Sequence, residues 1–439
     1  MMTSAEKTQR MVTRLSQELS ATRVRGAAPT RLERNRDNNL LAAVMLNAFA
    51  RQSKQKPLTD LEQALIKGFQ KLGYSPADLS ALGGVFAQAP VDARSRIFPE
   101  RSAHLNEETG YSLADLRAEL PRLAQEVPNM RNLHVIDSRH LSTAGFSPAD
   151  LQRKRAELGL GEEVKLAQAP RASESFRQAQ RELGWSITCV GVKPERAVAV
   201  RGATLGRVKL SAGRVSCYEG THEAGNDEPF YGFAVSDGET GTKYVSEELS
   251  MDEGDSRTFQ PNTLWDAAVP GGGLAITTDA WEADHSNQYD KEIEVLTEIL
   301  KILLDELFID NWMEMGQAII DQVTGAGIPA EAIALMAIIV GSVIAILKNE
   351  DDYIGTYTAL IPNAALLDWK ESVGQLKGMS TSEAIQFLAE HYCGGDLMDA
   401  MLKYMILSKI TNWALTVGVP MDAVSENHGY YEVFFDAWV

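Results

Sequence analysis

The chain has 439 residues, which is too long for one small core, and its 44% hydrophobic and 23% charged residues are typical of a folded protein. The formal net charge is −18, but residues 1–180 contribute +6 (26 Lys and Arg, 20 Asp and Glu) and residues 181–439 contribute −24 (16 and 40). Because phosphate binding needs clustered positive charge, we expect no nucleic-acid partner; the acidic half suits cations.

The N-terminal segment is basic. Residues 1–56 contain 11 Lys and Arg against 4 Asp and Glu, and the first twenty residues lack the apolar stretch of a cleavable signal peptide. We predict a partly disordered basic tail that leads into a first helix at LLAAVMLNAF; the alternative is a segment that docks on an acidic surface. We expect the protein to be cytoplasmic or exported by a route that is independent of a signal peptide.

A short motif then recurs three times, as GYSPADL (73–79), GYSLADL (110–116) and GFSPADL (145–151). In each copy the Ser can cap a helix N-terminus, and the Asp three residues later can complete a capping box. The aromatic residue before the Ser is spaced to pack on the Leu of the next turn as a hydrophobic staple. The repeat therefore predicts a helical repeat domain over residues 57–183.

The pattern changes to strands after Trp185. Short β-branched or aromatic runs, among them WSITCVGV, FYGFAVSDG and LAITTDAWEAD, are separated by Gly, Pro, Asn and Asp; strands resume at DYIGTYTALI and end with GYYEVFFDAWV. We predict an acidic antiparallel β-sandwich over 184–439, with helical insertions near 291–348 and 376–416. The expected fold class is α+β and multidomain, with the helical repeat region first and an inserted helical hairpin in the sandwich.

The first insertion contains the most apolar segment of the chain. EIEVLTEILKILLDEL predicts an amphipathic helix, TGAGIP a turn, and Ala330 to Lys348 a second helix. Residues 332–347 carry no charge, but a bilayer needs about twenty such residues. We predict a helix buried against the sandwich and its amphipathic partner. The alternative is a hairpin that is released to insert in a membrane, helped by low pH.

Four acidic segments follow or precede predicted strands: GNDEP, VSDGE, WEADHSNQYD and NEDDY. Calcium takes six to eight oxygen ligands, which carboxylates on neighbouring loops can supply. The last two segments bracket the first insertion, so folding is expected to bring them together at one end of the sheet. The alternative is that these acids are only solvated loop residues.

The order DEPFYGFAVSDG, MDEGDSRTF, LAITTDAWEAD, DDYIGTYT and YYEVFFDAW resembles the calcium-binding β-sandwich typified by synaptotagmin and the conventional protein kinases C. The resemblance covers roughly residues 185–295 and 350–439, and the long helical insertion departs from it. It implies Ca²⁺ as the bound ion and a lipid membrane or a protein as partner. The ligands that it implies are Asp227, Asp284, Asp290, Asp351 and Asp352.

The chain shows no catalytic signature. His391 and Cys393 in HYCGGD are two residues apart and would not face each other on a helix. We therefore predict a non-enzymatic, calcium-binding interaction module, of the bacterial effector or toxin type, whose hydrophobic helical hairpin engages membranes. The alternative function is a structural or cargo component of a larger assembly, docked through its basic N-terminal segment.

Overall fold

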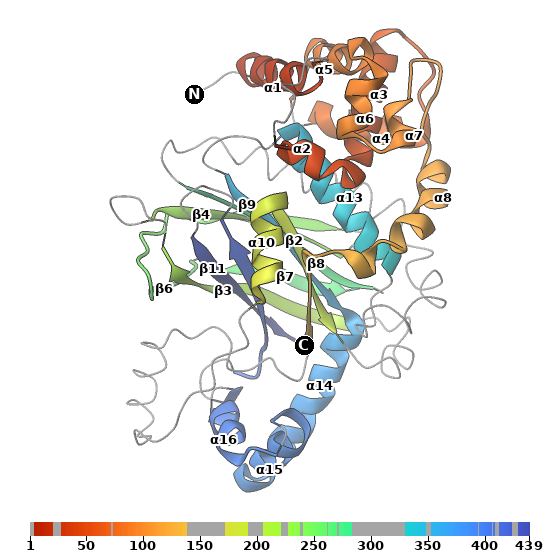
Figure 1. Cartoon of the computed structure of the whole chain (residues 1–439). Helices are drawn as coiled ribbons and strands as arrows, with labels where there is room; N and C mark the ends of the chain where they lie inside the picture. Colours follow the sequence, from red (N-terminus) through yellow and green to blue (C-terminus); the bar gives the residue numbers. More distant parts are fainter. Residues whose placement is uncertain are drawn as a thin grey trace.

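The chain folds into a helical region, a pair of β-sheets and a group of helices beyond the sheets, as seen from top to bottom in Figure 1. This computed structural model confirms the α+β class and the N-terminal helical region. The structure describes residues 4–20, 28–71, 73–137, 172–191, 205–220, 227–237, 240–260, 262–269, 272–282, 330–347, 353–393, 395–405, 407–408, 412–423 and 429–439.

Short helices make up the N-terminal region. They are α1 Ser4–Glu18, α2 Arg31–Arg34, the 3-10 turn η1 Arg36–Asn38, α3 Leu40–Ser53, α4 Asp60–Lys71, α5 Pro76–Gln88, α6 Val91–Ile97, α7 Glu100–Ala103, α8 Leu113–Ala124 and the 3-10 turn η2 Val127–Asn129. Within residues 1–56, the first helix that we expected at LLAAVMLNAF after the tail is α3, and it is buried from Leu40 to Arg51. Its apolar side chains explain this, because they can be removed from water only inside a core.

The two described copies of the repeated motif start helices as predicted. Ser75 accepts a hydrogen bond from the backbone N–H of Asp78 at 3.2 Å, and the Asp78 carboxylate accepts one from the N–H of Ser75 at 2.9 Å. Ser112 and Asp115 form the same capping box at the start of α8. The helices pack on different partners, α5 on α3 and α1 but α8 on α13 (Ala330–Leu347). The third copy, at 145–151, lies outside the described residues.

Sheet A has six strands in the order β1-β2-β9-β8-β4-β5. Its strands are β1 Leu133–Asp137, β2 Trp185–Gly191, β4 Pro229–Ser236, β5 Gly241–Val245, β8 Gly273–Glu282 and β9 Tyr353–Pro362. We expected antiparallel sheets throughout, but β1 pairs with β2, and β2 with β9, in parallel. The chain returns between β1 and β2 through helix α10 (Glu174–Leu183), and such a crossover lets neighbouring strands run the same way.

Sheet B is antiparallel, as predicted. Its strands follow the order β10-β11-β3-β6, and β7 also pairs with the long strand β3. They are β3 Leu205–Glu219, β6 Ser256–Thr258, β7 Thr263–Val269, β10 Leu415–Asp422 and β11 Tyr430–Trp438. Strand β10 begins where we expected the second helical insertion to end. The helices there are α14 Asn363–Gly378, α15 Thr381–Tyr392 and α16 Leu397–Met405, so helix begins earlier than expected.

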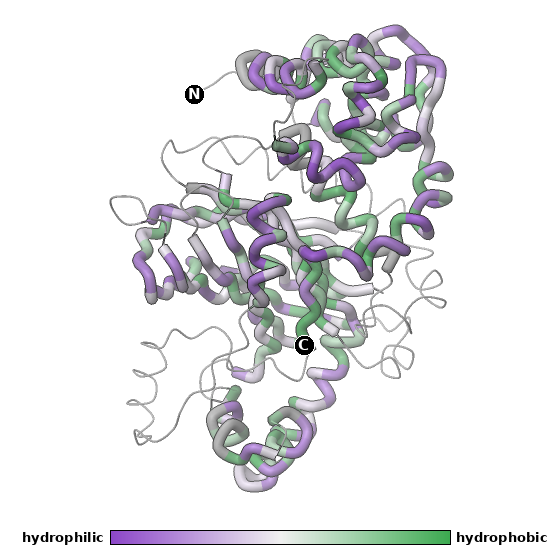
Figure 2. Tube along the Cα trace, viewed as in Figure 1, coloured by the Kyte–Doolittle hydropathy of each residue, from purple (hydrophilic) through white to green (hydrophobic). Residues whose placement is uncertain are grey.

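Two apolar cores lie on opposite faces of sheet A. One fills the space between the sheets and extends to α14, α15 and α16. The other joins the N-terminal helices, one face of sheet A and α13. We expected α13 to lie against the sandwich and an amphipathic partner helix; it instead packs mainly on α8 and α3, and touches sheet A through β2. Figure 2 shows this hydrophobic helix between the helical region and the sheets. The proposed partner, at 291–327, lies outside the described residues.

No helix in the described ranges is both long and apolar enough to cross a membrane.

The contact between α3 and α5 supplies a test of this packing. A Cβ added at Gly83 would lie 2.3 Å from the backbone nitrogen of Ala50, whereas at Gly84 the nearest atom would be the Gln88 side-chain nitrogen at 3.7 Å. Gly83→Ala should therefore lower the free energy of unfolding by about 1–3 kcal/mol through overpacking. The neighbouring control, Gly84→Ala, should raise it by roughly 0.5–1 kcal/mol. Urea unfolding measures both, and equal effects would contradict the packing.

Candidate functional site

Three ends of strands meet at one edge of sheet A, next to the predicted calcium ligands. Pro229 at the start of β4 pairs with Glu282 at the end of β8, and Trp281 of β8 pairs with Tyr353 at the start of β9. The acidic segments leave the sheet from these ends. Of the predicted ligands, only Asp227 is described; Asp284, Asp290, Asp351 and Asp352 lie outside the described residues.

Asp227 is a buried carboxylate between the two sheets. Only 4% of the residue is exposed, and the hydroxyl of Tyr431 in β11 donates a hydrogen bond to its Oδ2. Its backbone forms a bridge with Met251, with N–H···O distances of 3.1 and 2.9 Å. Burial, and then the negative charges of Asp227 and Glu253, raise the pKa of the nearby Cys217 thiol to about 12. Asp227 therefore links sheet A to sheet B in this structure.

The described residues do not themselves assemble a metal site. Among them, His, Cys, Asp and Glu side chains form no group of three or more that could hold a metal ion. The topology places the strand ends that flank these acidic segments next to one another. The ligand set itself remains a prediction.

A second polar cluster lies on the face of sheet A that is turned to the helical region. The hydroxyl of Thr356 donates to Asp279 Oδ1 at 2.5 Å, and the Tyr353 hydroxyl contacts Thr356 Oγ1 and donates to the Gly184 carbonyl at 3.2 Å. Asp279 is fully buried. The Arg31 guanidinium lies 5.9 Å from the centre of the Tyr353 ring, and burial lowers the pKa of Arg31. This cluster attaches β8 and β9 to the junction with α2.

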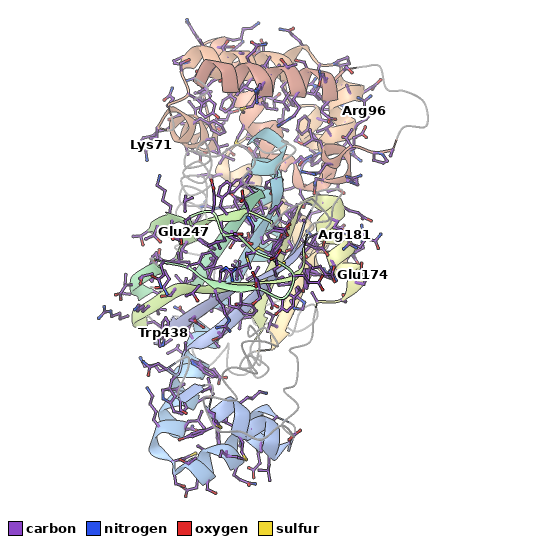
Figure 3. All side chains as sticks on the ribbon, turned by 90° about the vertical axis from the view of Figure 1, so that its left-hand side faces the viewer. Lys71, Arg96, Glu174, Arg181, Glu247 and Trp438 are labelled. Atoms are coloured by element: carbon purple, nitrogen blue, oxygen red, sulfur yellow. The ribbon has the colours of Figure 1, made fainter. Side chains whose placement is uncertain are left out.

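Ion pairs hold helix α10 against sheet B. Arg177 Nε and Arg181 Nη1 both donate to Oδ2 of the buried Asp422, at 2.7 and 2.6 Å. Arg177 also binds Glu219 through two hydrogen bonds, and Arg181 binds Glu174 at 2.5 Å (Figure 3). Burial raises the pKa of Asp422, although both arginines oppose the shift. These contacts fix the position of α10 at the C-terminal ends of β3 and β10.

The other end of α10 is held by the helical region. The Arg34 guanidinium donates to the Glu182 carbonyl at 2.9 Å, and the Asn35 side chain donates to the Leu183 carbonyl at 2.8 Å. These carbonyls belong to the last turn of α10, where no intrahelical donor is available. Helix α10 thus joins the helical region to both sheets.

Helix α13 is surrounded by η1, α3, α8 and β2, and we call these four elements together the cradle. Residues 333–342 of α13 are all buried. Gly341 permits a close approach, since a Cβ there would lie 2.7 Å from Asn38 Cβ and 3.0 Å from the Asn38 carbonyl oxygen. A larger residue at this position would push α13 away from η1.

Ser342 of α13 makes a specific polar contact with the otherwise apolar cradle. Its hydroxyl oxygen accepts a hydrogen bond from the backbone N–H of Ala42 at 2.9 Å and donates one to the Asn38 carbonyl at 3.3 Å. Ala42 is the third residue of α3, whose N–H is normally satisfied by the N-cap side chain. The N-cap residue, Asn39, instead donates to the carbonyls of Leu32 and Ile97. Ser342 therefore caps α3 from 300 residues away along the chain.

Sequence reasoning missed most of these residues. Asp279 and Asp422 stand inside strands, and their partners are distant in sequence. Ser342 did carry a signal, because Gly341 and Ser342 interrupt an otherwise apolar run, as small residues do at close helix contacts. His391, considered as a catalytic candidate, stacks on Phe387 with ring centres 4.2 Å apart.

Comparison with known proteins yields no match: no protein-family model fits the chain, and no curated protein or solved structure is significantly similar to it.

Removal of the hydroxyl of Tyr431 tests the link at Asp227. Tyr431→Phe leaves a buried carboxylate without this donor, and we expect a loss of about 1–3 kcal/mol in the free energy of unfolding. Tyr244→Phe is the control, because the hydroxyl of this partly exposed tyrosine makes only a 3.3 Å contact with the Gln260 carbonyl. Thermal unfolding compares the two variants, and an unchanged Tyr431→Phe protein would contradict the link.

Proposed function

We propose that the chain is a non-enzymatic, calcium-binding interaction module of the bacterial effector or toxin type, which stores an apolar helix and exposes it at a membrane. The observation that carries the proposal is the cradle. The most apolar helix of the C-terminal half is buried by helices of the N-terminal half, through a glycine contact and one serine hydroxyl.

The energetics of α13 favour release at a membrane over release in water. Six large apolar side chains are buried in the cradle: Ile333, Leu335, Met336, Ile338, Ile339 and Val340. At about 1.5–3 kcal/mol each, their exposure to water would cost on the order of 10 kcal/mol. Lipid hydrocarbon is as apolar as leucine, so a bilayer can replace the cradle without this cost.

Loosening of the cradle should increase membrane activity. Gly341→Ser introduces the forbidden Cβ without adding apolar surface, and should weaken docking of α13 by about 1–3 kcal/mol. We expect this variant to release dye from lipid vesicles at least fivefold faster than the unsubstituted protein, because about 1 kcal/mol changes a population by that factor. The assay is repeated at pH 5 and pH 7, with and without calcium.

The control for this experiment is Gly374→Ser in α14, where an added Cβ has no atom within 4 Å. It carries the same substitution in an open position and should leave leakage unchanged. Absence of leakage for every protein at both pH values would contradict the membrane function. Equal leakage by the two variants would contradict the role of the cradle.

The calcium part of the proposal is supported by the adjacent strand ends at the edge of sheet A. Titration by calorimetry should show binding heat that is lost in an Asp351→Ala/Asp352→Ala double variant, since each substitution removes a carboxylate ligand. The control is Asp266→Ala. Asp266 lies on β7 of sheet B, and its carboxylate pairs with Arg207. The same heat in the double variant and the unsubstituted protein would contradict the assigned ligands.

The second candidate is a structural or cargo role in a larger assembly. It is supported by exposed cations of the helical region such as Arg10 and Lys67. The docking segment would then be part of a folded surface, because α3 within residues 1–56 is a core helix. Binding of a protein partner without any lipid binding would favour this role.

A further inference from the structure

Helix α1 covers part of the core that holds α13. It packs on α5 and also contacts α13. Met11 and Leu15 on one side of it, and Leu19 directly after its last residue, belong to the same apolar cluster as the buried residues of α13. The neighbouring positions Gln9, Arg10, Thr13, Ser16 and Gln17 are exposed. Helix α1 is therefore amphipathic, with one side on the core and the other in solvent.

Helix α1 has fewer buried side chains than α3. Helix α3 is buried at twelve successive positions from Leu40 to Arg51, so it cannot leave without disrupting the whole region. In α1 the buried side chains are those of Thr8, Met11 and Leu15, and the Arg96 guanidinium donates to the carbonyl of its last residue, Glu18, at 3.3 Å. Elements with fewer buried contacts open first, so α1 detaches from the core more easily than α3.

The charge of this end of the molecule indicates what can bind a detached α1. Residues 1–71 contain 13 Lys and Arg against 6 Asp and Glu, whereas residues 181–439 carry a net charge of −24. Near an anionic surface this distribution turns the helical region toward the surface and the sheets away from it. Helix α1 contains Lys7, Arg10 and Arg14 against Glu6 and Glu18, a net charge of +1, and this cationic, amphipathic composition favours an anionic lipid interface.

We propose that α1 is a membrane-sensing gate. It detaches from α5 and α13 to bind an anionic lipid bilayer, and in doing so it uncovers α13 at the bilayer surface. The inference rests on the proposed membrane function and adds its trigger and lipid class. Lipid binding by α1 competes directly with its contacts to α5 and α13, because the same stripe of Met11, Leu15 and Leu19 serves both.

The first test uses the full chain with vesicles of phosphatidylserine and phosphatidylcholine or of phosphatidylcholine alone. Hydrogen exchange of residues 333–342 should accelerate at least tenfold with the anionic vesicles and stay unchanged with the neutral ones. Arg10→Glu changes the charge by two units, and each unit near such a surface contributes a factor of about five. The variant should therefore bind the anionic vesicles about thirtyfold more weakly. Lys370→Glu makes the same charge change on an exposed position of α14 and should bind normally.

A second pair of variants tests the gate without lipid. Leu15→Asp places a charge on the buried side of α1 and should accelerate exchange of residues 333–342 in solution. Ser16→Asp places the same charge on the exposed side and should not. Unchanged exchange in Leu15→Asp, equal response to both kinds of vesicle, or normal vesicle binding by Arg10→Glu would each overturn the proposal.

The outcomes separate this inference from the function on which it rests. Exposure of α13 on anionic vesicles without dye release would contradict the proposed function and leave the gate intact. Dye release by the unsubstituted protein that is equal on anionic and neutral vesicles would contradict the gate and leave the function intact.

Discussion

The structure depends on the burial of α13. A helix that is apolar on all sides cannot lie on a surface, so it needs partners around its whole circumference. The chain provides α3 and η1, α8, and β2 of sheet A as these partners. As a result, residues from Met11 to Leu360 share one apolar core. Side chains from both sides of residue 184, where the charge of the chain changes sign, belong to this core.

The contact of Gly341 and Ser342 with η1 and α3 explains how α13 is positioned along its seat. Apolar packing alone is non-directional and would allow the helix to slide. The glycine fixes where the backbones approach, and the serine hydroxyl satisfies a backbone N–H that α3 leaves without its own cap. A polar hydroxyl inside an apolar helix is therefore part of the docking and has its hydrogen-bond partners.

Helix α10 determines how the helical region is attached to the sheets. Its arginines meet Asp422 and Glu219 on sheet B, and its last carbonyls accept hydrogen bonds from Arg34 and Asn35. A buried ion pair such as Arg177–Asp422 adds little net stability once desolvation is included, but it leaves few alternative positions for the helix. The basic end and the acidic end of the molecule are thereby held in a fixed orientation, on which the proposed approach to an anionic membrane depends.

The sequence by itself determined the local elements. The capping boxes at Ser75 and Ser112, the extent of α13 and the strands β4, β8, β9 and β11 follow from patterns of a few neighbouring residues. Strand β10 was missed because the predicted helical insertion extended to residue 416. Pro420 is accommodated in β10 because this is an edge strand, where a missing N–H is tolerated. Only the tertiary structure decided the parallel pairing of β1, β2 and β9, the hydrogen bond from Tyr431 to Asp227, and the packing of α13 in the cradle. These contacts join residues far apart in the chain, where sequence spacing gives no information about which surfaces meet.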